Sequence, residues 1–231
     1  MDVIKALLLE PVGCLAEFRA DEFNTAAAEL GAAAADAPST GSLAYWRLIG
    51  LIEQQRDGLA AATRARLQEL ELRAVEHADL YPDVAPALAA LRELDVATIL
   101  VSSLSRAAID RFIERFSLSD LLAGAIARDE AGGVRGKPLR HAIARVPLDP
   151  QRIMVLVDTA DAIALAKETG LNAMLMINDY DEGRALATLN PAGGLVSLAE
   201  LPDALRLIEQ QSGMRPPSRP PRGPFELFDP G

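Results

Sequence analysis

Short apolar runs and amphipathic stretches alternate along most of this 231-residue chain. The apolar runs are too short for helices and end at polar or turn-forming residues, which is typical of strands buried on both faces of a parallel sheet. They cover residues 3–9, 97–101, 121–127, 152–157 and 172–177, with a last short run at 194–196. The amphipathic stretches between and after them have helical spacing, at 85–93, 106–116, 139–145, 161–169 and 198–210. This alternation predicts an α/β fold with a doubly wound parallel sheet of the Rossmann type.

Residues 16–80 follow a different pattern, because helical spacing continues there without a convincing strand. Three amphipathic helices are expected, around 18–30, 43–52 and 59–75. We therefore predict an all-helical cap at 16–80, inserted into a core domain made of residues 1–15 and 81–211. Trp46 has helical spacing and is expected to pack within the cap or to face the cleft beneath it.

The composition changes at residue 212, after which proline and arginine dominate. Proline lacks a backbone donor and fixes φ, so residues 212–231 are expected to form an extended, disordered tail rather than a helix or central strand. The tail ends in an apolar cluster, Phe225, Leu227 and Phe228. A second interpretation is that this cluster docks the tail on a protein partner.

The charge and the cysteine content exclude several classes of partner. A formal net charge of −10 argues against nucleic acid and against an anionic membrane surface. No apolar run approaches the roughly 20 residues that span a bilayer. A single cysteine, Cys14, excludes an internal disulfide. We expect a cytoplasmic protein.

Polar side chains follow the predicted strands at the edge where the carboxyl ends of parallel strands meet. Glu10 follows the first strand, Ser102 and Ser103 follow the second, and Asp158 follows the fourth. Lys137 is expected directly after a polar loop at 129–136, which brings it to the same edge. A carboxylate can attack phosphorus, a hydroxyl and an ammonium can hold phosphoryl oxygens, and a second carboxylate can complete a Mg²⁺ site. This order of groups therefore predicts a site for a phosphoryl group.

Over about residues 4–208 the chain resembles the haloacid dehalogenase superfamily. The matching motifs are Glu10 to Leu15, Val101 to Ser103, Gly136 to Pro138 and Val157 to Gly170. The resemblance implies a Rossmann-like core with a helical cap and a hydrolase or phosphatase activity that depends on Mg²⁺. It assigns substrate binding to Ser102, Ser103 and Lys137.

The first motif departs from the family pattern at its reactive positions. Glu10 stands where the family has a nucleophilic Asp, and Val12 stands where it has the Asp that acts as general acid and base. Glutamate is one methylene longer, and a misplacement of about 1 Å can cost roughly a hundredfold in rate. Valine has no proton to exchange. Cys14 replaces a phosphoryl-binding threonine, and in the fourth motif Ala162 replaces an acid that is displaced to Asp161.

Some groups that can bind a metal ion are still present at this end of the sheet. Glu10, the backbone carbonyl of Val12 and Asp158 could hold Mg²⁺ weakly, and the alternative is that no metal binds.

Our leading hypothesis is a hydrolase-fold protein that is catalytically impaired or inactive and that binds a phosphorylated small molecule or a protein partner. One alternative is an active Mg²⁺-dependent phosphatase or hydrolase of a small metabolite, with Glu10 as the nucleophile. Another is an interaction module that acts through residues 212–231.

Each of these side chains also has a purely structural interpretation. Glu10 can accept hydrogen bonds from nearby backbone amides at the end of its strand. Ser102 can cap the helix that follows it. Asp158 can form an ion pair with Lys137, which would satisfy both charges without a ligand.

Overall fold

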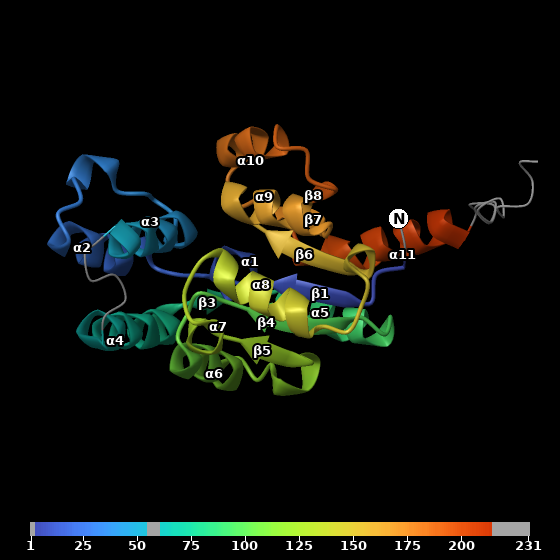
Figure 1. Cartoon of the computed structure of the whole chain (residues 1–231), viewed down its shortest axis with the longest axis horizontal. Coiled ribbons are helices and arrows are strands. Elements are labelled where there is room, and N and C mark those ends of the chain that lie inside the picture. The colour runs from blue at the N-terminus through green and yellow to red at the C-terminus, as the bar shows by residue number, and fades with distance from the viewer. Residues whose placement is uncertain (1–2, 55–60, 214–231) are drawn as a thin grey trace, which may run out of the picture.

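The computed structural model describes residues 3–54 and 61–213, and these form a core built on a six-stranded parallel sheet (Figure 1). The strand order is β5-β4-β1-β6-β7-β8. The strands are β1 Ala6–Leu9, β4 Ala97–Val101, β5 Gly124–Ile126, β6 Ile153–Val157, β7 Asn172–Met176 and β8 Gly193–Leu195. Because β1 lies in the middle, Ala6 pairs with Ala97 on one side and with Ile153 on the other. The predicted α/β fold with a parallel sheet is confirmed.

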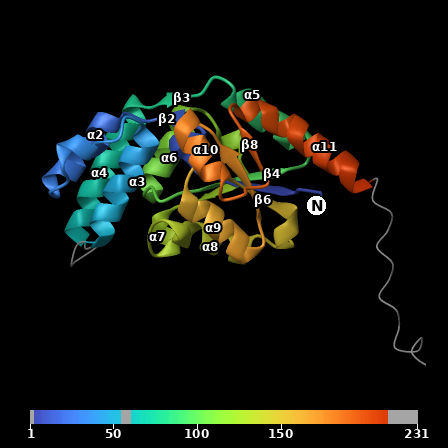
Figure 2. The same ribbon diagram turned by 90° about the horizontal axis from the view of Figure 1, so that it is seen from above.

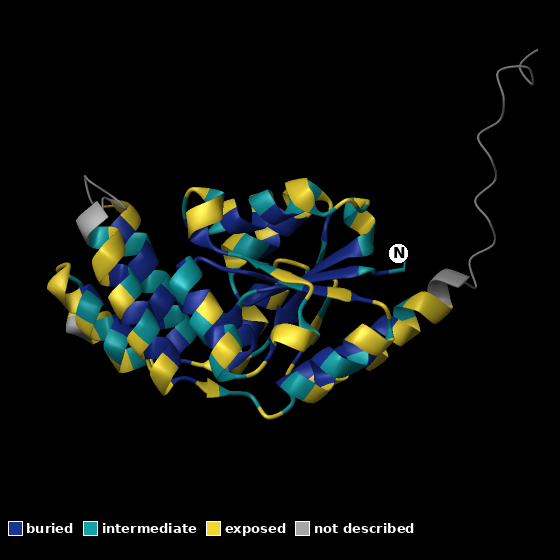
Figure 3. Ribbon diagram, turned by 90° about the horizontal axis from the view of Figure 1, so that it is seen from below, coloured by how far each residue is buried: buried dark blue, intermediate teal, exposed yellow. Residues whose placement is uncertain are grey.

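Helices cover both faces of the sheet (Figure 2). One face is packed by α5 Val84–Glu93, α6 Arg106–Arg115 and α11 Leu201–Gly213, and the other by α8 Gly136–Arg145, α9 Ala160–Thr169 and α10 Tyr180–Ala187. Side chains of a strand alternate between faces, so Leu7 and Leu9 join one apolar layer and Leu8 joins the other. All of β1 is consequently buried (Figure 3). None of the helices in the described ranges is both long and apolar enough to cross a lipid bilayer.

The cap consists of helices α2 Ala20–Glu29, α3 Gly41–Gln54 and α4 Ala61–His77, and it lies at the opposite end of the molecule from the C-terminal end of α11 (Figure 1). Two short strands join it to the core, β2 Ala16–Glu17 and β3 Asp79–Leu80, which pair antiparallel. The prediction that 16–80 contains no strand is therefore wrong at both ends. Two residues are too few to show the alternation by which a strand is identified from sequence.

Two further segments differ from the predictions. The expected loop at 129–136 contains the short helix α7 Arg128–Ala131, in which the Glu130 carboxylate accepts a hydrogen bond from the Ala127 amide at 2.8 Å. Helix α10 was not predicted at all; the Asp179 side chain caps it by accepting from the Glu182 amide at 2.9 Å. Helix α11 continues to Gly213, and the remainder of the predicted tail, 214–231, lies outside the described residues.

Candidate functional site

Glu10 lies at the carboxyl end of β1, against the two serines that follow the neighbouring strand β4. The Ser102 hydroxyl donates a hydrogen bond to one carboxyl oxygen of Glu10, and the Ser103 amide donates to the other at 3.2 Å. Ser102 Oγ itself accepts from the Leu104 amide at 3.0 Å. Burial of the Glu10 carboxyl raises its pKa to about 8, although these hydrogen bonds favour the charged form. At neutral pH the carboxyl is thus mostly protonated.

Asp158 lies at the carboxyl end of β6, on the other side of β1. It is buried and accepts a hydrogen bond from the hydroxyl of Ser42, in the first turn of the cap helix α3. Burial raises the pKa of the Asp158 carboxyl to about 6. The cap therefore reaches the predicted site through Ser42, a residue that the sequence did not single out.

Gly13 makes this approach of the cap to the core possible. Its φ is +80°, a conformation that glycine adopts without strain. A Cβ at this position would lie 2.5 Å from Asp158 Oδ2 and 2.7 Å from Ser42 Oγ. The Gly13 carbonyl accepts a hydrogen bond from the Asn178 side chain at 2.7 Å, which fixes the turn after β1.

Val12 and Cys14 do not occupy the space in front of Glu10. Both are fully buried members of the apolar cluster that runs from the sheet into the cap. Burial also raises the pKa of the Cys14 thiol well above its usual value, so it stays protonated. These two positions contribute apolar packing where a catalytic acid and a hydroxyl would act.

Lys137 is not delivered by a loop to the acids at the strand ends. It lies in the first turn of α8, is exposed, and donates from Nζ to the Gly132 carbonyl at 3.3 Å. The predicted ion pair with Asp158 is wrong, because Asp158 is bound by Ser42. The interpretation of Ser102 as a helix cap is also wrong, since Ser105 caps α6 by accepting from the Ala108 amide at 3.3 Å.

Arg135 lies two residues before Lys137 and contacts the serine loop, residues 102–105, which follows β4. Its backbone amide donates to Ser103 Oγ at 2.8 Å. Its guanidinium pairs with Asp161 at 2.9 Å and with Glu53 of the cap. Asp161, the displaced acid of the fourth motif, is thus bound to Arg135.

A cavity of about 810 Å³ lies between cap and core. Glu10, Asp158 and Arg135 line it from the core, and Trp46 and Arg47 line it from α3. Its size suits a small organic ligand. Trp46 therefore faces the cleft, which was one of its two expected positions. The cavity joins the acids at the strand ends to a mixed polar and apolar wall.

The donors available for Mg²⁺ are few. Glu10 and Asp158 both have a carboxyl oxygen engaged by a protein hydroxyl and a pKa raised by burial. Within residues 3–54 and 61–213 no three His, Cys, Asp or Glu side chains lie together as metal ligands. At pH 7 Asp158 is ionised whereas Glu10 is mostly protonated, and a protonated carboxyl is a poor ligand for a hard cation, so this donor set fits Mg²⁺ poorly.

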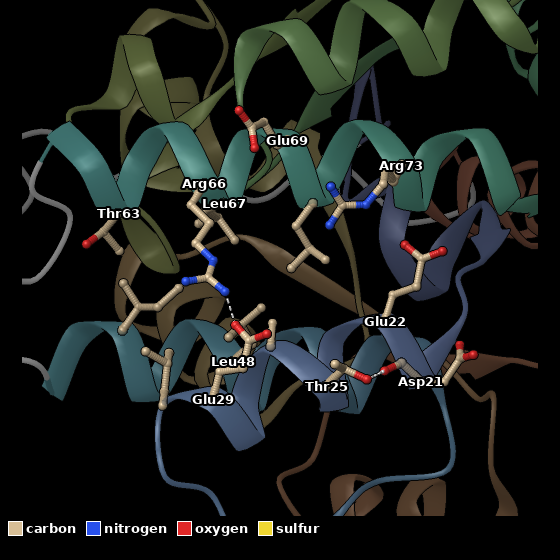
Figure 4. A pocket seen from close by; sticks show the side chains of 14 residues that line it. Asp21, Glu22, Thr25, Glu29, Leu48, Thr63, Arg66, Leu67, Glu69 and Arg73 are labelled. Carbon is tan, nitrogen blue, oxygen red and sulfur yellow. Dashed lines mark hydrogen bonds and ion pairs between the residues drawn. The ribbon is translucent and has the colours of Figure 1, made fainter.

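A second cavity, of about 720 Å³, lies within the cap between α4 and the pair α2 and α3 (Figure 4). Leu48 and Leu67 are among its apolar residues, and an ion pair between Arg66 and Glu29 crosses it. None of the site residues predicted from the sequence lines it. Of the predicted site residues, Glu10 and Asp158 line the cavity between cap and core, whereas Ser102, Ser103 and Lys137 do not.

Behind the serine loop lies a buried ion pair, Glu71 of α4 with Arg128 of α7, whose side chains are 0% and 2% exposed. Glu71 also accepts from Tyr45 Oη at 3.3 Å and from the Ser105 amide at 3.0 Å. Arg128 donates to the Ser103 carbonyl at 3.0 Å. Sequence analysis missed this pair.

A family model described as a haloacid dehalogenase-like hydrolase matches residues 8–170. A haloacid dehalogenase-like family hydrolase from Streptococcus pneumoniae has a TM-score of 0.69 at 16% identity, covering 88% of this chain and 99% of its own. The phosphatase of this superfamily from Thermococcus onnurineus has a TM-score of 0.59 at 20% identity, covering 87% and 98%.

The L-2-haloacid dehalogenase from Xanthobacter autotrophicus has a TM-score of 0.61 at 17% identity, covering 88% and 98% of the two chains. No curated protein sequence matches the chain. At these identities the structural likeness shows the fold.

Proposed function

This chain belongs to the haloacid dehalogenase-like hydrolases, and on that basis we propose that it is a catalytically impaired member that binds a small phosphorylated molecule between its cap and core. The observation that carries the proposal is the state of Glu10. Both of its carboxyl oxygens accept hydrogen bonds from the serine loop, and its pKa is raised to about 8.

A carboxyl group in this state is a poor nucleophile. Attack on phosphorus requires an ionised carboxylate with a free lone pair aimed at the reacting atom. Glu10 is mostly protonated at pH 7, and both oxygens are turned to Ser102 and Ser103. The leaving group would also lack a proton donor, because Val12 is apolar and fully buried. Nucleophilic attack and protonation of the leaving group are therefore both weakened.

Ligand binding requires neither a nucleophile at Glu10 nor a proton donor at Val12. The cavity between cap and core lies in the size range of small-molecule sites, and it combines apolar walls with arginine side chains. Protonation of Glu10 at neutral pH removes one negative charge that would repel an anionic ligand. We therefore place the binding function in this cavity. A protein partner is the other proposal for what the chain binds. Deletion of residues 212–231 tests whether the tail docks such a partner.

The decisive experiment measures turnover and binding on the same proteins. A panel of phosphorylated metabolites with Mg²⁺ is assayed for phosphate release by the wild type and by Glu10→Gln, which keeps the size of the side chain. We expect both proteins to release phosphate at the background rate and both to show a ligand-dependent rise in Tm. Turnover by the wild type that disappears in Glu10→Gln would overturn the proposal.

That outcome would support the second candidate function, an active hydrolase that uses Glu10. The observation in its favour is that Glu10 and Asp158 line the same cavity. Such an enzyme would become faster as the pH rises toward 8, because Glu10 must ionise before it attacks. A pH profile of any activity found in the panel therefore separates the two functions.

A further inference from the structure

Arg135 stands in a tight turn between α7 and α8 whose backbone favours glycine. The Lys137 amide donates to the Val134 carbonyl at 3.3 Å and closes a four-residue turn in which Arg135 is the second residue. Arg135 has φ 56° and ψ −121°, the conformation that glycine normally supplies in a turn of type II′. A residue with a side chain is strained in this conformation, and such strain concentrates at ligand clamps and active sites.

The contacts of Arg135 show what keeps it in this conformation. Its amide is held by Ser103 Oγ, and the amide of Ser103 in turn binds Glu10. Its guanidinium reaches across from core to cap, to Asp161 on α9 and Glu53 on α3. The side chain and the backbone of this one residue thus connect the serine loop, the start of α9 and the cap.

Gly50 of the cap provides the room for the guanidinium. A Cβ on Gly50 would lie 2.6 Å from Arg135 Nη2. Within residues 3–54 and 61–213, Nη2 of Arg135 has no hydrogen-bond partner, whereas Nε and Nη1 each bind one acid. Arg135 therefore lines the cavity, with Nη2 against Gly50 of the cap helix and Nε and Nη1 on the two acids.

We propose that Arg135 is the anion-binding residue of this cavity, and that its guanidinium takes the phosphate of the ligand in the place that the sequence motif assigns to Lys137. This inference rests on the proposed function, that the cavity binds a phosphorylated molecule. Arginine presents paired N–H groups that match two phosphate oxygens. The ligand displaces Asp161, which is 74% exposed and therefore easily rehydrated, while the contact with Glu53 keeps the cap in place.

The other cations near the cavity fit this role less well. Arg140 is held by both oxygens of Glu168, at 3.1 and 3.0 Å. Arg47 donates to the Ala33 carbonyl at 2.8 Å and has no recorded contact with the serine loop. Lys137 is exposed and does not line the cavity. Only Arg135 among these four bonds to the loop that holds Glu10.

The test uses inorganic phosphate as the probe, titrated by calorimetry into the full chain at pH 7. Arg135→Met is expected to weaken binding by on the order of tenfold or more, and Arg135→Lys by less, because it keeps the charge and loses the fork. Lys137→Met is the matched control and is expected to bind within about twofold of the wild type. Arg135→Gly relieves the backbone strain, so it is expected to stay folded and still lose phosphate binding.

Asp161→Asn sharpens the test, because it removes the acid that competes for the guanidinium. We expect it to tighten phosphate binding by roughly two- to tenfold, which a structural role of Arg135 would not produce. Binding that survives Arg135→Met but is lost in Lys137→Met or Arg47→Met would overturn the inference and leave the proposed function standing. If the wild type binds neither phosphate nor any phosphorylated metabolite, the proposed function fails as well.

Discussion

Two glutamates lie on either side of the loop formed by residues 102–105, and only one of them has a cation. Glu71 is bound by Arg128, by Tyr45 and by the Ser105 amide, all of them buried. Glu10 is bound by the hydroxyl and the amide of two serines and by no positive charge among the described residues. The two acids thus differ in charge compensation, although they share one loop.

The difference separates a structural role from a titrating one. Burial raises the pKa of the Glu71 carboxyl, Arg128 opposes that rise, and the ion pair links the cap helix α4 to the core helix α7. A buried acid without a cation lowers its free energy by taking up a proton. Glu10, which has no cation beside it, titrates near neutral pH, as does Asp158 with its pKa of about 6.

The largest effect on stability is expected from breaking the buried ion pair between Glu71 and Arg128. Glu71→Leu or Arg128→Met leaves one charge buried without a partner, which typically costs about 3–5 kcal/mol of the free energy of unfolding. The double variant should recover a large part of that loss, because neither charge remains. Chemical denaturation of the two single variants and the double variant measures the coupling. Additive losses would show that the two residues do not act as a pair.

The pH dependence of the free energy of unfolding tests whether Glu10 is protonated in the folded protein. The ordinary pKa of 4.5 for Glu10 is raised to about 8, so the folded state retains a proton that the unfolded state releases above pH 4.5. The stabilisation is complete below pH 4.5 and is lost as the pH rises to 8. Between pH 6 and 8, above the raised pKa of Asp158, the loss for one proton approaches about 1.4 kcal/mol per pH unit.

Glu10→Gln cannot ionise and should show a flatter stability profile over that range. Unfolding by urea at pH 6, 7 and 8 compares the two proteins. Parallel profiles would mean that Glu10 titrates below pH 6 in the folded protein.

Gly13→Ala tests the close contact of Gly13 with Ser42 and Asp158, where the cap meets the core. The new Cβ would clash with both side chains, in addition to the strain of a positive φ. We expect a loss of about 2–3 kcal/mol, measured by thermal unfolding. Gly31→Ala is the matched control, since Gly31 also has a positive φ but no heavy atom within 4 Å of a Cβ. It should cost about 1 kcal/mol from backbone strain alone. Equal losses would exclude the steric contact.

The smallest effect is expected at an exposed pair outside the comparison. Arg140 and Glu168 form two hydrogen bonds, but their side chains are 53% and 64% exposed. Glu168→Gln should leave the free energy of unfolding nearly unchanged, because water and salt screen the pair. A loss as large as that of Glu71→Leu would remove the distinction between buried and exposed pairs.

The sheet could be predicted from the sequence because each strand is a local apolar run bounded by polar residues. The prediction matched β4 at both ends and placed Glu10, Ser102 and Asp158 at the ends of strands, and the structure shows that these strands are neighbours in the sheet. Parallel strands align their carboxyl ends, so this part of the site follows from strand order.

The remaining site residues depend on contacts between distant segments, which no local pattern records. Ser42 reaches Asp158 across 116 positions, and Asn178 reaches Gly13 across 165. The position of Lys137 was wrong because α8 starts at Gly136, three residues earlier than predicted, after a tight turn with Arg135 at positive φ. One signal was present for Glu71, which lies on the apolar stripe of α4 with Leu67, Ala74 and Val75.

The central place of β1 in the sheet also has a consequence for synthesis on the ribosome. Its neighbours β4 and β6 follow it by about 90 and 150 positions, with the whole cap in between. At roughly 5–20 residues per second, the first strand leaves the ribosome about 5–20 s before β4 is made. During that interval an apolar strand has no partner in its own chain. The sheet of this protein therefore closes late in synthesis, and during that interval residues 3–9 are open to a chaperone that binds short apolar segments.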